Sequence, residues 1–288
     1  MTIIYVRQDG MGQFTEIRPA LEAARAGDTV EIHKGIYPES LDTYDFAMAS
    51  GESWSRKITV RAKAGHGVEV SPLSGMFALR LAHSQHYVEF QRITFNGLHV
   101  EHSSVKLTHS GPDRSTQVSH IRLRDCLICD GHAQGIELNA DDCELIRCRF
   151  ERNGSTDYPM KPWQLHGAYI SGSRNQVIDC DASLNLGNGI VIQDLSDPLR
   201  GSYNVVKNFR GRDNARCGYG GGIYLGAGRN NVLDRPTCTG AQYGIRVSAR
   251  VTGTRIIREW VHGNTPHPYN LQIPTGVYVE DGAIVVFE

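Results

Sequence analysis

Six short segments of this chain repeat one another: each begins with a glycine and places apolar residues at alternate positions of the strand that follows. In the first, Gly135-Ile-Glu-Leu, the side chains of Ile136 and Leu138 would leave one face of a strand and Glu137 the other. Successive glycines of the set are 32, 22, 33, 22 and 32 residues apart. Repeats of this length indicate stacked units, each of which buries its apolar face on its neighbours. The six glycines are Gly135, Gly167, Gly189, Gly222, Gly244 and Gly276.

A second set of alternating segments lies between the glycine-led strands, and each is followed by a residue suited to a turn. Asn, Asp and Gly tolerate the left-handed backbone that a sharp corner needs. Strands joined by short corners, without helical crossovers, predict a solenoid of single coils. We therefore expect one domain over residues 1–288. The second strands are His120–Arg124, Glu144–Arg147, Gln176–Asp179, Asn204–Lys207, Asn231–Asp234 and Thr254–Ile257, and the corners are Asp130, Asn153, Asn185, Asp213, Gly240 and Asn264.

Residues 1–40 predict an N-terminal cap together with the first coil. Thr15 is a candidate N-cap, Pro19 falls in the first helical turn, and Gly27 would end the helix. Ile17 and Leu21 share one helical face, so an amphipathic helix would close one end of the stack.

Two groups of motifs resemble known families. Asp9-Gly-Met-Gly-Gln-Phe-Thr15, Ala26-Gly-Asp-Thr-Val-Glu-Ile-His33 and Gly35-Ile-Tyr-Pro-Glu39 resemble the start of pectin esterases. The glycine-led strands are similar to the repeats of polysaccharide lyases, epimerases and phage tailspikes. The resemblance to this pectin-lyase-like superfamily implies an all-β fold: a single-stranded right-handed parallel β-helix of roughly ten coils, with an N-terminal capping α-helix. It implies a fold more than an activity, because this scaffold carries many chemistries.

Composition and charge narrow the expected partners. There are 30 lysines and arginines against 31 aspartates and glutamates, so no overall field favours nucleic acid or an anionic membrane. The first residues lack the pattern of a signal peptide, which predicts a cytoplasmic or phage-associated protein unless an export signal has been removed. The seven cysteines form an odd set, for which free thiols are expected. Cys126 and Cys129 have no second ligand pair, so we expect no metal and no cofactor.

The polar faces of the glycine-led strands would form columns of exposed side chains. Adjacent coils lie about 4.8 Å apart, so a carbohydrate chain along the axis would pass several of these residues. Tyrosines and arginines in a row fit an acidic polysaccharide or oligosaccharide, although a solvated sheet face is polar in any case. One column comprises Arg80, Lys106, Glu137, Tyr169, Val191, Tyr224, Arg246 and Tyr278, and its neighbour comprises Thr108, Asn139, Ser171, Gln193, Gly226, Ser248 and Glu280.

Long insertions precede three of the glycine-led strands, at residues 154–165, 214–221 and 265–275. Stacked on one side of the columns they would form a wall, and long loops on a rigid scaffold are common sites of function. The wall and the columns together supply the residues that we expect to bind substrate, which are Arg80, Lys161, Trp163, Gln193, Arg216, Tyr219 and Tyr278.

His166 lies where the longest of the early insertions meets its strand, three residues before the outward Tyr169. For β-elimination or C5-epimerisation of a uronic acid, one group removes the proton beside the carboxylate, another supplies a proton, and a cation stabilises the charge. We expect His166 to act as base or charge neutraliser, with a structural role in capping the loop as the alternative. The other catalytic candidates are Tyr169 or Tyr224 as acid/base, Arg246, Lys106 or Lys161 as carboxylate binders, and Glu137 on the same column.

Other chemistries of this fold are less well matched. The outward columns lack the acidic cluster of calcium-dependent pectate lyases, and the catalytic aspartates of pectin esterases are not found. Asn139-Ala-Asp-Asp-Cys143 and His166-Gly167 are similar to polygalacturonase motifs, but Asp141 and Asp142 would lie in a corner. The predicted function is a carbohydrate-active lyase or epimerase; the alternatives are a polygalacturonase-type hydrolase and a non-catalytic carbohydrate-binding or phage structural module. The apolar strand Ala283–Phe287 must be covered, which allows a homo-oligomer.

Overall fold

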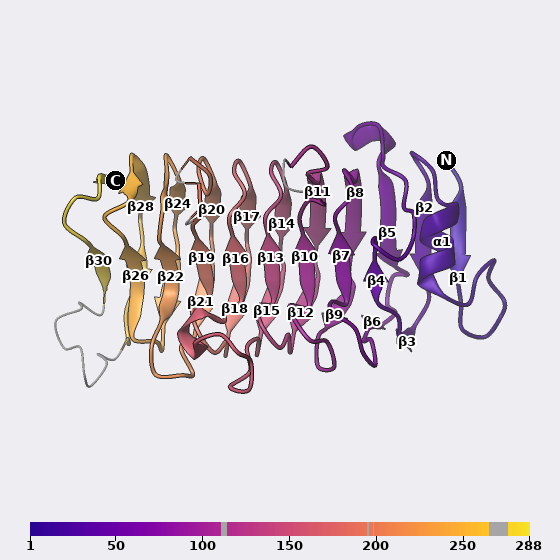
Figure 1. Ribbon diagram of the computed structural model, residues 1–288, viewed down its shortest axis with the longest axis horizontal. Coiled ribbons are helices and arrows are strands. Elements are labelled where there is room, and N and C mark those ends of the chain that lie inside the picture. Colours follow the sequence, from indigo (N-terminus) through magenta and orange to yellow (C-terminus); the bar gives the residue numbers. More distant parts are fainter. Residues whose placement is uncertain (111–113, 195, 198, 265–275) are drawn as a thin grey trace.

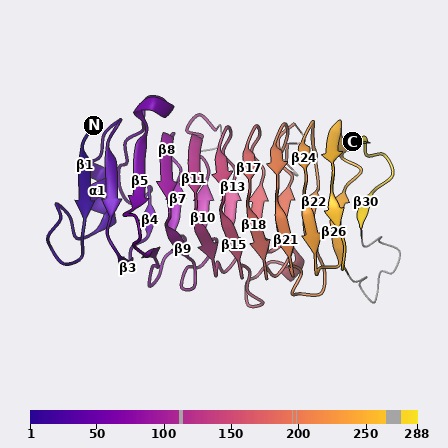
Figure 2. The same cartoon turned by 180° about the vertical axis from the view of Figure 1, so that it is seen from behind.

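The chain forms one stack of coils in the computed structural model, which describes residues 1–110, 114–194, 196, 197, 199–264 and 276–288 (Figure 1). A typical coil contributes one strand to each of three parallel sheets, which contain 11, 9 and 9 strands. Figure 2 shows the same stack from behind, with the helix α1 (Ile17–Ala23) at the N-terminal end. The predicted parallel β-helix with an N-terminal helical cap is confirmed.

The three sheets are named here by the order in which the chain visits them. The first sheet contains β1 (Ile3–Val6), β2 (Thr29–Ile32), β5 (Ile58–Ala62), β8 (His86–Gln91), β11 (Ser119–Arg124), β14 (Glu144–Ile146), β17 (Gln176–Ile178), β20 (Val205–Lys207), β24 (Val232–Asp234), β28 (Thr254–Ile257) and β31 (Val285–Phe287). The second sheet contains β3 (Gly35–Tyr37), β6 (Val68–Val70), β9 (Thr94–Asn96), β12 (Leu127–Cys129), β15 (Arg149–Glu151), β18 (Asp181–Ser183), β21 (Arg210–Arg212), β25 (Thr237–Thr239) and β29 (Trp260–Val261). The third, which we call the glycine-led sheet, contains β4 (Leu41–Asp42), β7 (Leu79–Leu81), β10 (Val105–Leu107), β13 (Ile136–Leu138), β16 (Ala168–Ile170), β19 (Ile190–Ile192), β22 (Gly221–Leu225), β26 (Tyr243–Val247) and β30 (Val277–Val279). The remaining elements are the pair β23 (Gly228–Arg229) and β27 (Val251–Thr252) and the 3-10 turns η1 (Trp54–Arg56) and η2 (Pro162–Gln164).

The core runs along the axis of the stack. Ile136 and Leu138 are fully buried on either side of the outward-facing, partly buried Glu137, as the alternation predicts. The second sheet was not predicted, because most of its strands are three residues long and turn only their middle residue inward. Phe150 of β15 and Cys238 of β25 are such residues, and a single apolar position gives no alternation to detect.

The N-terminal helix is capped differently from the prediction. Glu16 rather than Thr15 occupies the N-cap position, and its side chain makes no capping hydrogen bond. Instead the backbone N–H groups of Ile17 and Arg18 donate to the two carboxylate oxygens of Glu39, at 2.7 and 2.8 Å. A residue 22 positions along the chain therefore does what a local hydroxyl was expected to do.

Asparagine side chains bridge consecutive coils inside the corner between the second and the glycine-led sheets. The Asn153 amide donates to Asn185 Oδ1 at 2.9 Å, and the Asn185 amide donates to Asn214 Oδ1 at 2.8 Å. The left-handed residues at two of these corners are Arg152 and Leu184, each one position earlier than predicted. Asn153 and Asn185 are thus buried links and not the turn residues themselves.

The expectation of free thiols agrees with the structure. All seven cysteines are free. The backbone N–H of Cys148 contacts the sulfur of Cys180 at 3.3 Å, so these two residues lie side by side on neighbouring coils. In the described part of the chain, no helix has the length and apolar character needed to cross a membrane.

Replacing Asn185 by Ala should lower the free energy of unfolding by at least about 2 kcal/mol, because buried groups on the two neighbouring coils lose their hydrogen bonds with the Asn185 side chain. Urea unfolding followed by circular dichroism measures this change. Gln176→Ala is the matched control, since the Gln176 amide is exposed on β17, and it should change stability by less than about 0.5 kcal/mol. Equal effects of the two substitutions would contradict a stabilising role for the asparagine links.

Candidate functional site

The outward residues of the glycine-led sheet stand in register from coil to coil. Lys106 pairs with Arg80 on one side and with Glu137 on the other. The predicted column is confirmed at each position, although Val191 is fully buried within it. Its members are Arg80, Lys106, Glu137, Tyr169, Val191, Tyr224, Arg246 and Tyr278.

The N-terminal part of the column is occupied by ion pairs within the protein. Arg80 donates two hydrogen bonds to Asp42, at 2.7 and 2.6 Å, and its guanidinium lies 4.0 Å from the centre of the Tyr44 ring. Lys106 Nζ lies 2.7 Å from Glu137 Oε2. Both cations that were expected to meet a substrate are therefore already paired with carboxylates.

Glu137 is held as a carboxylate. Burial alone would raise its pKa, but the hydrogen bond with His102 and the positive charge of Lys106 outweigh burial and lower the pKa to about 2. Ser103 also donates a hydrogen bond to Glu137, at 2.7 Å. A group that remains ionised at neutral pH cannot donate a proton there. Glu137 is therefore better suited to holding its neighbouring side chains in place than to acting as a catalytic acid.

Two adjoining cavities form a groove over the central and C-terminal part of the glycine-led sheet. Cavity 1, of about 470 Å³, lies over Glu137 and Tyr169. Cavity 2, of about 540 Å³, lies over Tyr224 and Arg246. The two share three lining residues, Gln164, His166 and Gln193, which therefore mark the junction.

His166 lies at this junction with a defined hydrogen-bonding state. Its side chain is buried, and its Nδ1 accepts the backbone N–H of Asn188 at 3.0 Å. Burial lowers the pKa of His166 to about 3, so the imidazole is neutral near pH 7. Because Nδ1 accepts, the hydrogen of the neutral ring lies on Nε2. The residue is thus arranged as a neutral donor, which suits charge neutralisation and does not suit a base.

Tyr169 lies beside His166 at the junction. The two rings are stacked at 8° between planes, with centroids 6.3 Å apart. Burial raises the pKa of Tyr169, although a hydrogen bond with Gln193 opposes this, so the phenol keeps its proton at neutral pH. A protonated tyrosine next to a neutral imidazole donor provides two hydrogen-bond donors at one point of the groove.

Cavity 2 contains a second group of polar side chains. Arg246 donates to Glu280 Oε1 through Nε and Nη2, at 2.9 and 2.7 Å, and to the Tyr219 hydroxyl through Nη1 at 2.6 Å. Its guanidinium also lies 5.4 Å from the centre of the Tyr224 ring. Burial raises the pKa of Tyr224, and the charge of Arg246 acts against that rise. Tyr219, expected on the wall, therefore reaches the column.

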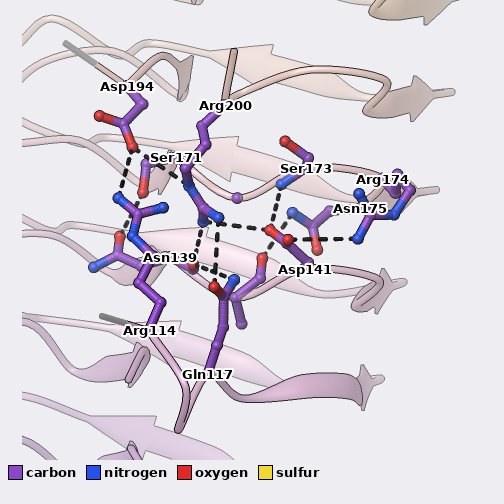
Figure 3. Close-up of polar contacts among 12 residues, drawn as sticks. Arg114, Gln117, Asn139, Asp141, Ser171, Ser173, Arg174, Asn175, Asp194 and Arg200 are labelled. Atoms are coloured by element: carbon purple, nitrogen blue, oxygen red, sulfur yellow. Dashed lines mark hydrogen bonds and ion pairs between the residues drawn. The ribbon is translucent and has the colours of Figure 1, made fainter. Parts of the chain in front are cut away.

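A second wall, which the sequence did not predict, lies where the chain leaves the glycine-led sheet. Figure 3 shows Arg200 crossing to earlier coils, where it donates to the Asn139 carbonyl at 2.6 Å and lies 3.3 Å from Asp141. Asp194 pairs with both Arg114 and Arg200, at 3.5 Å each. The only available signal was the extra chain length after the glycine-led strands, near residues 108–118 and 194–202.

Several expected binding residues lie away from the groove. Arg216 donates to the Leu184 carbonyl at 3.1 Å and lines a separate surface hollow. As far as the described residues define the two cavities, neither is lined by Arg80, Lys161 or Tyr278. The side chain of Trp163 and the insertion at 265–275 lie outside the described residues. Within that same part of the chain, no three His, Cys, Asp or Glu side chains group as metal ligands.

Residues 81–264 match the family described as "Right handed beta helix region". The chain belongs to the right-handed β-helix family. The match spans more than half of the 288 residues and confirms the predicted handedness. No curated protein matches the sequence.

Solved structures with the same fold include polysaccharide-degrading proteins. An alginate lyase from Paenibacillus sp. str. FPU-7 is similar over 98% of this chain and 99% of its own, with a TM-score of 0.65 and 13% identity. Pectate lyase Pel9A covers 100% of this chain and matches over 74% of its own, with a TM-score of 0.66 and 14% identity. A tailspike protein, gp49 from Acinetobacter baumannii bacteriophage Fri1, is similar over 99% of this chain and 62% of its own, with a TM-score of 0.50 and 13% identity. At these identities the similarity establishes the fold alone.

Ionised Glu137 should stabilise the protein by up to about 3 kcal/mol above pH 5, because its pKa is lower in the folded chain than the unperturbed value of about 4.3. That contribution should disappear as the pH falls toward 2. Urea unfolding at pH 6 and pH 3.5 should therefore show a smaller pH-dependent loss in Glu137→Gln than in the wild type. Glu101→Gln, at an exposed carboxylate, should retain the wild-type loss. An unchanged pH dependence in Glu137→Gln would contradict the pairing.

Proposed function

We propose that this protein acts on an acidic polysaccharide or oligosaccharide by β-elimination or C5-epimerisation. The observation that carries the proposal is the pairing of His166 with Tyr169 at the junction of two cavities. A sugar chain along the groove would place one residue at this junction and its neighbours in the two cavities. The β-helix proteins of similar structure named as alginate and pectate lyases also support a carbohydrate substrate.

The reaction begins with loss of the proton on the carbon next to the sugar carboxylate. The electron pair that remains gives an enolate-like charge on the carboxylate, which a hydrogen bond from His166 Nε2–H stabilises. In elimination, this pair forms a carbon–carbon double bond as the glycosidic oxygen leaves and takes a proton from Tyr169. In epimerisation, a proton returns to the same carbon from the opposite face.

Tyr224 is the tyrosine that we assign to removal of the proton. The charge of Arg246 acts to lower the pKa of Tyr224 against the effect of burial, whereas the charges of Asp194 and Glu137 act to raise the pKa of Tyr169. Arg246 itself is engaged by Glu280 and Tyr219, so its role is electrostatic and it is not free to grip a carboxylate. Arg250 also lines cavity 2 and makes no ion pair with any described residue, which makes it the better carboxylate binder.

A polygalacturonase-type hydrolase has less support in this groove. Inverting hydrolysis needs one protonated carboxyl group as acid and one carboxylate as base. Of the carboxylates lining cavity 1, both Glu137 and Asp194 have a lowered pKa. Asp142 lies in a corner with a left-handed backbone and pairs with Arg174, which leaves it away from the column.

Incubation with alginate, polygalacturonate and other acidic polysaccharides should produce ultraviolet absorbance from unsaturated uronate together with new reducing ends. Epimerisation would instead change the uronate composition, measured by proton NMR, without shortening the chain. Reducing ends without absorbance would contradict the proposal in favour of a hydrolase. Binding without any chemical change would contradict it in favour of a carbohydrate-binding module.

His166→Ala and Tyr169→Phe should each lower turnover of the active substrate by roughly 10²-fold, the usual scale for a group that transfers or neutralises charge. Steady-state kinetics measures the loss, and circular dichroism checks the fold. His99→Ala and Tyr203→Phe are the matched controls, because both side chains are exposed outside the groove, and they should keep wild-type rates. Full activity in His166→Ala would leave the histidine with its structural role alone.

A further inference from the structure

The residues just before the first five glycines of the glycine-led strands form a column of their own. Backbone hydrogen bonds run from Gly135 to the His166 carbonyl and from Gly167 to the Asn188 carbonyl, each at 3.0 Å. The column therefore steps once per coil. Its members are Gln134, His166, Asn188, Gly221 and Tyr243.

Asn188 is the centre of this column. Its backbone N–H donates to His166 Nδ1 at 3.0 Å, and its side-chain Nδ2 lies 3.3 Å from the same atom. Its Oδ1 accepts hydrogen bonds from the Tyr243 hydroxyl at 2.6 Å and from the Gly221 N–H at 2.8 Å. Asn188 is thus held in place by Tyr243 and Gly221 from later coils, and it in turn binds His166 on the preceding coil.

Tyr243 reaches Asn188 only because the residue between them has no side chain. Tyr243 pairs with Gly221 on the neighbouring coil, and its hydroxyl contacts Asn188 one coil further, 55 positions away in the sequence. A Cβ on Gly221 would collide with the Tyr243 ring. Glycine at this position therefore permits a contact that spans two coil spacings.

We propose that Tyr243 and Asn188 are positioning residues that hold His166 as a neutral Nε2–H donor for an oxygen of the bound ligand, the carboxylate of an acidic sugar. The proposal rests on the proposed function for the identity of that oxygen. The tautomer and its control by Tyr243 rest on the hydrogen bonds alone.

The arrangement differs from simple filling of the core. Tyr243 and Asn188 both line cavity 2, yet neither side chain is exposed by more than 3%. A buried hydroxyl that only needed a partner could have used a backbone carbonyl, as the Tyr37 hydroxyl does with His33 at 2.9 Å. The Tyr243 hydroxyl instead binds the one side chain whose backbone fixes the imidazole.

Long-range proton–nitrogen NMR of the 15N-labelled full chain reports the tautomer of each histidine, and His166 is assigned by the signal missing in His166→Ala. The wild type should show His166 protonated on Nε2 only. Tyr243→Phe should lower that population and reduce kcat by about 10-fold to 10²-fold, with KM changed less than about twofold, because the donor is misplaced and the groove is not. Gly221→Ala, which displaces the same ring, should act in the same direction.

Tyr37→Phe is the matched control, because it removes one buried tyrosine hydroxyl from a residue that is 1% exposed and far from the groove in the sequence and the stack. It should lower thermal stability while keeping kcat and the His166 spectrum of the wild type. Wild-type kcat and tautomer in Tyr243→Phe would overturn the inference, as would equal loss of kcat in Tyr37→Phe. A wild-type His166 that is charged at pH 7 or protonated on Nδ1 would also overturn it, without any variant. Absence of turnover on every acidic sugar would refute the proposed function alone, since the spectra would still show whether Tyr243 controls the tautomer.

Discussion

In-register parallel pairing between consecutive coils is the constraint on which the rest of this structure depends. Each strand places its residues directly beside those of the coil before and after it, so side chains 22 to 38 positions apart in sequence become neighbours. A slip of one residue would exchange buried and outward positions over the whole strand. The buried asparagine links at the corners oppose such a slip, because each amide has partners only when the coils are aligned.

The position of the groove follows from which corners between the sheets carry loop insertions. The corners from the first to the second sheet are short, as at Asp125 and Cys126, and they recur with little change. The two other corners carry insertions, and these rise on either side of the glycine-led sheet. Arg200 ties one of them back to Asn139 and Gln117 on earlier coils. A flat sheet face thus becomes a groove only where both kinds of insertion are present.

Charge pairing then divides the column into two regions that differ in their electrostatics. In the N-terminal part, Arg80 forms an ion pair with Asp42, and Lys106 forms one with Glu137. These pairs leave little unpaired charge there to bind a ligand. Around His166 the donors are instead neutral, being an imidazole and a phenol whose burial keeps them so. In a desolvated groove, fixed neutral dipoles stabilise developing negative charge without first being desolvated as ions themselves.

The repeat, the inward and outward alternation, and the column from Arg80 to Tyr278 could be predicted from the sequence, because side chains on a strand alternate with a period of two and the glycines show how the coils align. The sequence could not determine the second sheet, whose strands turn single residues such as Phe150 inward and carry no pattern. Nor could the sequence place Arg200, whose partner Asn139 lies 61 positions away and is reached because an insertion folds back over earlier coils. It also could not place Tyr243, which reaches Asn188, 55 positions away, across the space above Gly221. The sequence named His166 as a site residue. That its ring is a neutral donor could be seen only in the folded chain, since this depends on the Asn188 N–H from the next coil and on burial of the ring.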